Sequence, residues 1–115
     1  MGKTKAEPNV DVPDGDAGIG KSIFEQQCAA CHSTGDKTDA GASAPAMGGL
    51  IGRKAGATKF KYSGAMKKSG IVWTEKHIFA YLQAPGKYVP GNRMAFAGIG
   101  DAGERGHLIA YLKTL

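Results

Sequence analysis

Hydrophobic positions recur with helical spacing in three parts of the chain, and this pattern predicts three helices. The first covers residues 18–31 and follows Asp16, a residue that can cap a helix. The second follows Thr74 and ends near Ala84, because the proline after it disfavours helical geometry in its predecessor. The third follows Asp101 in an arrangement that resembles a capping box. The apolar positions are Ile19, Ile23 and Phe24, then Ile78, Tyr81 and Leu82, and finally Leu108, Leu112 and Leu115.

The segments between these helices hold few large apolar side chains. Residues 33–62 are dominated by Gly, Ala, Ser and Thr, and residues 85–91 form a turn-rich, extended stretch with two prolines. Alternation typical of strands is absent, so we expect an all-α fold. Residues 1–13 are polar and aperiodic, which predicts a flexible N-terminal extension. Residues 14–115 then form one folded domain.

The composition indicates that the helices need something to enclose. The 115 residues include 18 glycines, and this share is roughly twice the ordinary usage. Three helices of this length cannot easily enclose a core while much of the chain is Gly-rich loop. A buried prosthetic group would supply the missing apolar volume. No apolar run approaches the roughly 20 residues of a membrane-spanning helix.

The charge favours acidic partners over nucleic acid. Fifteen Lys and Arg against ten Asp and Glu give a net charge of +5, and the sequence pI is 9.3. Such a field speeds the encounter with acidic proteins. No Arg-rich run or groove-reading motif accompanies it, so we expect no nucleic-acid partner. The N-terminus carries no apolar core of a secretory signal.

The strongest chemical signal is the stretch Cys28-Ala29-Ala30-Cys31-His32, the C-x-x-C-H pattern of covalent c-type haem attachment. On a helical turn both thiols reach the two vinyl groups of a haem, and His32 follows to meet the iron. A thioredoxin-like pair would want a βαβ context, and a lone disulfide would leave His32 unexplained. A zinc site would need four ligands, and the other histidines, His77 and His107, are far apart in sequence.

The second axial position of the iron decides between electron transfer and ligand binding. Met94 lies in an extended stretch restrained by proline, where a core-packing role is not the default. We therefore favour Met94 as the second ligand. Met66 is expected to pack, and His77 and His107 are expected at the surface or on a helix face.

Beyond this motif, residues from about 15 to 115 resemble mitochondrial-type class I cytochrome c. The resemblance covers nearly the whole folded part and rests on matches that occur in order. They are Gly20, Phe24, Gly52-Arg53, Tyr62, Gly70-Ile71-Val72-Trp73, Tyr81-Leu82, Pro85, Tyr88-Val89-Pro90-Gly91, Met94-Ala95-Phe96-Ala97-Gly98 and Leu108-Ile109-Ala110-Tyr111-Leu112.

The resemblance implies the cytochrome c fold, with three main helices and long Gly-rich loops around one covalently bound haem c. It implies that His32 and Met94 ligate the iron, that the Pro45 carbonyl supports His32, and that the first and last helices cross at Gly20. It places Arg53, Tyr62 and Trp73 near the haem propionates. The haem-binding residues that it implies are Cys28, Cys31, Pro45, Arg53, Tyr62, Trp73 and Tyr81.

The resemblance also implies a soluble one-electron carrier, with no substrate turnover of its own, that shuttles between a bc1-type reductase and cytochrome c oxidase. We expect a monomer in the mitochondrial intermembrane space, docking on acidic faces of these complexes and able to touch the membrane surface peripherally. A carrier in the bacterial periplasm is the alternative. Two other readings are a peroxidase-like protein from which Met94 dissociates, although no distal His/Arg pair is present, and a binding module with a structural haem.

Overall fold

The computed structural model describes residues 5–27, 49–55, 64–91 and 98–115. These residues form five helices and one isolated antiparallel β-bridge, between Lys54 and Val72. Within the described ranges no longer strand forms, and no helix is long and apolar enough to cross a membrane. The helices are α1 Ala17–Gln27, α2 Gly64–Lys67, α3 Glu75–Gln83, α4 Pro85–Tyr88 and α5 Ala102–Leu112.

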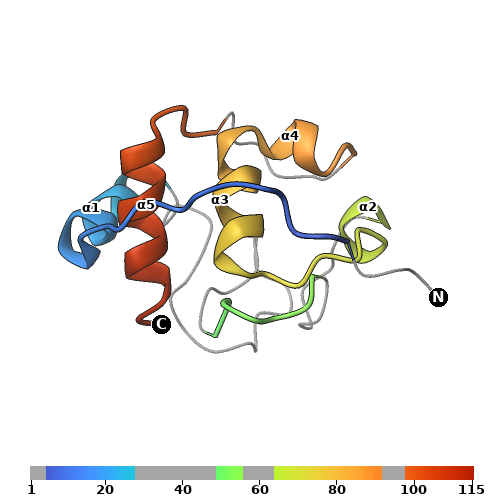
Figure 1. Ribbon diagram of the computed structural model, residues 1–115, viewed down its shortest axis with the longest axis horizontal. Coiled ribbons are helices and arrows are strands. Elements are labelled where there is room, and N and C mark those ends of the chain that lie inside the picture. Colours follow the sequence, from blue (N-terminus) through green and yellow to red (C-terminus); the bar gives the residue numbers. More distant parts are fainter. Residues whose placement is uncertain (1–4, 28–48, 56–63, 92–97) are drawn as a thin grey trace.

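The first and last long helices, α1 and α5, pack directly on each other, with α3 beside them (Figure 1). Gly20 on α1 makes the close approach: a Cβ built there would collide with the backbone carbonyl of His107 on α5. Phe24 lies next to this contact and is 2% exposed, with its ring centroid 5.6 Å from that of Tyr111. The predicted crossing at Gly20 is confirmed.

The predicted caps of all three long helices are confirmed. The side chain of Asp16 accepts a hydrogen bond from the amide of Ile19 at 3.0 Å. Thr74 accepts from the amide of His77 at 3.4 Å, and Asp101 accepts from the amide three residues ahead at 2.8 Å. Each cap satisfies an amide that the first turn of a helix leaves without a partner.

Two short helices were not predicted. The stretch expected to be extended after Ala84 instead makes one helical turn, α4, with Pro85 at its first position. Proline suits this position because its missing N–H would be unpaired there anyway. The other, α2, has four residues and is too short to show a hydrophobic period.

The N-terminal segment, residues 5–13, lies across α3 and α5 (Figure 1). Val10 and Val12 pack against the apolar core, and the carbonyl of Pro13 closely faces Gly106 on α5. Sequence analysis left residues 1–13 outside the folded part, whereas residues 5–13 add to the core cover. The flexibility of this segment stays a prediction.

Of the two positions expected for His77, the surface is wrong and the helix face is confirmed. This side chain lies on α3 and is 1% exposed. One cause is the N-terminal segment, because the carbonyl of Lys5 lies 3.2 Å from Nε2 of the imidazole. His107 is half-buried on α5, where its Nδ1 accepts from the amide of Asp16 at 2.9 Å.

Candidate haem site

Three of the predicted haem-binding residues, Arg53, Trp73 and Tyr81, lie in the described ranges, and the structure brings them together. The β-bridge joins the segments of the first two: the amide of Trp73 donates to the carbonyl of Arg53 at 2.8 Å. The amide of Gly52 donates to the carbonyl of Trp73, also at 2.8 Å. Gly52 has a φ of +86°, a left-handed conformation that glycine adopts without a steric cost. The turn at Gly52 therefore sets Arg53 beside Trp73.

Tyr81 joins this pair from α3. Its ring centroid lies 5.0 Å from that of Trp73, with the planes at 68°, an edge-to-face arrangement. Arg53, Trp73 and Tyr81 are 7%, 8% and 7% exposed, respectively. A bridge, a turn and a helix thus bring together three buried residues with polar side-chain tips, Arg53, Trp73 and Tyr81, which we call the donor cluster.

The electrostatics of the donor cluster favour an anionic ligand group. Burial raises the pKa of Tyr81 to about 12, so its phenol keeps its proton at neutral pH and can donate. Arg53 contributes a guanidinium, which carries several N–H donors in a planar fork, and Trp73 contributes an indole N–H. Carboxylates such as haem propionates are the acceptors that this set of donors suits. The residues present therefore fit a haem.

The other predicted site residues lie outside the described ranges. Within those ranges, no group of three or more His, Cys, Asp or Glu side chains could hold a metal ion. The iron ligands and the covalent links therefore stay predictions. The residues concerned are Cys28, Cys31, His32, Pro45, Tyr62 and Met94.

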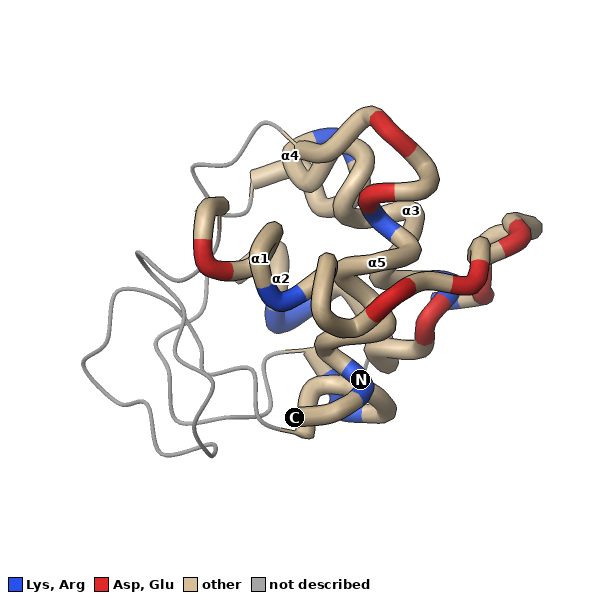
Figure 2. The backbone as a smooth tube through the Cα atoms, turned by 90° about the vertical axis from the view of Figure 1, so that its left-hand side faces the viewer, with Lys and Arg blue, Asp and Glu red and all other residues tan. Residues whose placement is uncertain are grey.

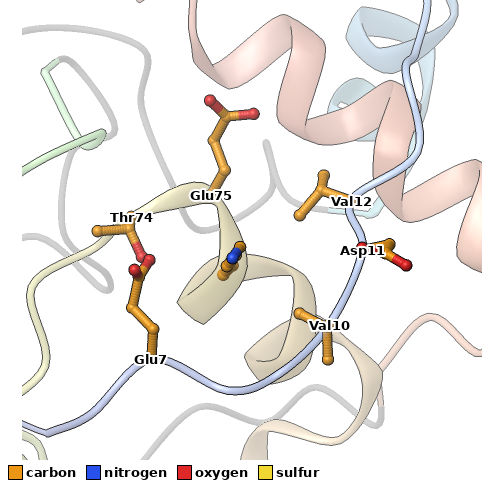
Figure 3. A pocket seen from close by; sticks show the side chains of 7 residues that line it. Glu7, Val10, Asp11, Val12, Thr74 and Glu75 are labelled. Carbon is orange, nitrogen blue, oxygen red and sulfur yellow. The ribbon is translucent and has the colours of Figure 1, made fainter.

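A pocket of about 390 Å³ lies between the N-terminal segment and the start of α3 (Figure 3). Its lining includes the carboxylates of Glu7, Asp11 and Glu75, together with Lys76. No predicted haem-binding residue lines it. This polar hollow is therefore separate from the donor cluster.

Sequence reasoning missed that two further aromatic side chains, Tyr88 and His77, extend the donor cluster. The ring of Tyr88 on α4 lies 6.2 Å from that of Tyr81 and 6.0 Å from that of His77, both edge to face. The spacing of four residues between His77 and Tyr81 on one helix is a signal that they share a face. No sequence signal places Tyr88 there, because α4 itself was not predicted.

A helical domain with the C-x-x-C-H pattern and a buried cluster of donors for carboxylates defines a c-type haem protein. Comparison with known proteins is more specific. The family profile described as cytochrome c matches residues 17–115. The chain belongs to the cytochrome c family.

Individual relatives agree with this assignment. Cytochrome c of Tetrahymena pyriformis is 56% identical over 110 residues, which cover 95% of this chain and 97% of that protein. Cytochrome c of Theileria parva is 47% identical over 109 residues, covering 95% and 94%. The solved structure of cytochrome cH from Methylobacterium extorquens matches with a TM-score of 0.79 at 38% identity, over 88% of this chain and 100% of that one.

Family membership confirms several expectations. The all-α cytochrome c fold, the resemblance to the mitochondrial type and the role of electron carrier are confirmed. Members of this family carry covalently bound haem c, and Cys28 and Cys31 are the two cysteines of this chain. The cofactor prediction therefore agrees with the family.

Proposed function

We propose that this chain carries single electrons from a bc1-type reductase to cytochrome c oxidase, as a monomer in the mitochondrial intermembrane space and without substrate turnover of its own. The observation that carries the proposal is the donor cluster, found in a member of the cytochrome c family with an intact attachment pattern. The eukaryotic sources of its relatives support the mitochondrial location.

The residues divide the work of holding the cofactor. Cys28 and Cys31 would link it covalently, and His32 and Met94 would ligate the iron, with the Pro45 carbonyl supporting His32. Haem c, when bound, supplies an iron that takes up and returns one electron. Arg53, Trp73 and Tyr62 would bind its propionates, and Tyr81 would be a further haem-binding residue. Because Trp73 and Tyr81 are buried, they would also help to keep water away from the cofactor.

The charge distribution limits where an acidic partner can dock. The two signs are separated along the described chain: residues 5–16 hold four Asp and Glu against one Lys, whereas residues 49–55 and 64–91 hold six Lys and Arg against one Glu (Figure 2). The described ranges hold ten Lys and Arg against eight Asp and Glu, and two of the cations, Arg53 and Arg105, are buried. The described surface is therefore close to neutral, so net charge alone does not choose a docking face. The positions of individual exposed lysines must therefore determine the docking face. Lys87 on α4 is exposed, and it is close to the donor cluster both in sequence and in the fold.

A pair of lysine variants tests docking. Lys87→Gln and Lys113→Gln each remove one positive charge from an exposed side chain. Lys113 differs in position, because it lies after α5, with its Nζ 3.5 Å from Oε1 of Glu75. We expect Lys87→Gln to slow oxidation of the reduced protein by cytochrome c oxidase at low salt more than Lys113→Gln does, with the difference fading at high salt. Equal rates for the two variants would refute docking through α4.

The iron ligands are tested by absorption spectra of both oxidation states. We expect the wild-type ferric protein to show a sulfur-to-iron charge-transfer band and Met94→Ala to lack it. Met47→Leu and Met66→Leu are matched controls that should keep the band. A band that survives Met94→Ala would assign the ligand to another residue.

A further inference from the structure

The buried imidazole of His77 is the centre of a hydrogen-bonded chain that the electron-carrier role does not use. Its Nε2 lies 3.2 Å from the carbonyl oxygen of Lys5, and its Nδ1 lies 2.7 Å from the hydroxyl of Tyr88. These contacts join the N-terminal segment, α3 and α4. We call the three residues the histidine latch.

The chemistry of the groups fixes the direction of the bond to Lys5 and, for a neutral imidazole, that of the bond to Tyr88. A backbone carbonyl only accepts, so Nε2 of His77 carries the proton and donates to Lys5. In the neutral imidazole Nδ1 is then the acceptor, and the hydroxyl of Tyr88 donates to it. Burial and the nearby carboxylate of Glu7 raise the pKa of Tyr88, so that phenol keeps the proton it donates.

Further contacts hold the two ends of the latch. The amide of Lys5 donates to the carbonyl of Gly70 at 2.7 Å, and its ammonium lies 4.7 Å from the ring centroid of Tyr88. The amide of Tyr88 donates to the carbonyl of Ala84 within α4 at 3.0 Å. The ring of Tyr88 also packs edge to face on Tyr81 of the donor cluster. A shift of Tyr88 would therefore disturb both α4 and the donor cluster.

We propose that His77 is a positioning residue for the haem site, which it serves by binding Lys5 and Tyr88 and so holding α4 and Tyr81 in place. The proposal rests on the proposed function in one respect: Met94, the proposed ligand, follows Tyr88 by six residues. The histidine latch anchors α4, the last described helix before Met94. The N-terminal segment thereby supports ligation of the iron.

The test measures how readily an added ligand displaces Met94. Cyanide binds the ferric iron only after the thioether of Met94 leaves it. The apparent affinity for cyanide therefore rises with the fraction of the protein in which Met94 is not bound to the iron. Tyr88→Phe removes one hydroxyl and keeps the ring. We expect this variant to lower the apparent dissociation constant of cyanide roughly tenfold, as the loss of one buried hydrogen bond predicts. Loss of the sulfur-to-iron band during the cyanide titration measures this constant.

Three further variants separate positioning from general destabilisation. His77→Leu removes both hydrogen bonds of the latch and should change cyanide affinity at least as much as Tyr88→Phe. His77→Gln, whose amide can donate and accept, should return cyanide affinity toward wild type. Tyr111→Phe removes a hydroxyl from α5 that forms no hydrogen bond with the described residues, and it should leave cyanide affinity unchanged. If His77→Leu fails to fold, Tyr88→Phe and His77→Gln still decide the question.

Hydrogen exchange gives a readout without an added ligand. The amides of Lys87, Tyr88 and Val89 bond within α4, and in Tyr88→Phe their protection should fall roughly tenfold. Unchanged cyanide affinity in folded Tyr88→Phe, or an equal change in Tyr111→Phe, would overturn the latch alone. A wild-type protein without the sulfur-to-iron band would overturn the proposed ligand set and the latch together.

Discussion

Replacing Gly20 by alanine tests whether the α1 and α5 contact sets the stability of the domain. An ideal Cβ there would lie 2.6 Å from the carbonyl carbon of His107 and 2.9 Å from Cβ of Tyr111, and it would collide with the carbonyl oxygen of His107. Ordinary carbon contacts are about 3.5–4.0 Å, so the helices must move apart by roughly 1 Å. Backbone atoms cannot rotate away, which puts the cost near the upper end of overpacking, about 3 kcal/mol.

Urea denaturation of the haem-loaded protein measures this loss. With a slope of about 2 kcal/mol per molar urea, the midpoint should fall by roughly 1.5 M. Gly86→Ala is the matched control, because a Cβ at this helical position on α4 meets nothing within 4 Å. It should be neutral or stabilising by up to about 1 kcal/mol. A Gly20→Ala midpoint equal to that of wild type would refute the close-packing argument.

Three more predictions concern single side chains. Asp101→Ala should destabilise the protein by about 1 kcal/mol through loss of the α5 cap. Asp101→Asn keeps a side-chain acceptor and should therefore melt at a higher temperature than Asp101→Ala. Equal melting temperatures for the two variants would contradict this. Arg105 donates from Nη1 to the carbonyl of Phe79 at 2.9 Å and lies over its ring, so Arg105→Met should cost about 1–3 kcal/mol in thermal unfolding through loss of this buried hydrogen bond. An unchanged melting temperature would contradict this. Burial raises the pKa of Tyr81 from 10.0 to about 12, so the unfolded chain loses this proton first and the free energy of unfolding falls between about pH 10 and pH 12. Over this pH range the free energy of unfolding, measured by denaturation, should decline less steeply in Tyr81→Phe than in wild type, whereas Tyr111→Phe should follow wild type. Identical slopes in the two variants would contradict the assignment to Tyr81.

The long helices could be predicted because their signals are local. Asp16, Thr74 and Asp101 each act on an amide three residues ahead, and such a bond can be recognised from spacing alone. The short helices could not be predicted in this way. One turn at Pro85 has no period of its own and depends on the packing around it.

The candidate site shows the same division between local and distant effects. The attachment pattern is a local signal, whereas the approach of Arg53 to Trp73 depends on a bridge between distant segments, and only the family resemblance predicted it. The burial of His77 was missed because its cover comes from Lys5 at the other end of the chain. A long-range contact that closes a large loop leaves no pattern in the neighbouring residues.

The bonds made by Lys5 also bear on proteolysis. Trypsin cuts after lysine, but it requires an extended substrate whose backbone groups are available to the protease. The amide and the carbonyl of Lys5 are both bonded within the folded chain, although the residue is exposed. The peptide bond between Lys5 and Ala6 is therefore shielded, and the rate at which a limited digest cleaves it would report how often Lys5 leaves its two hydrogen-bond partners.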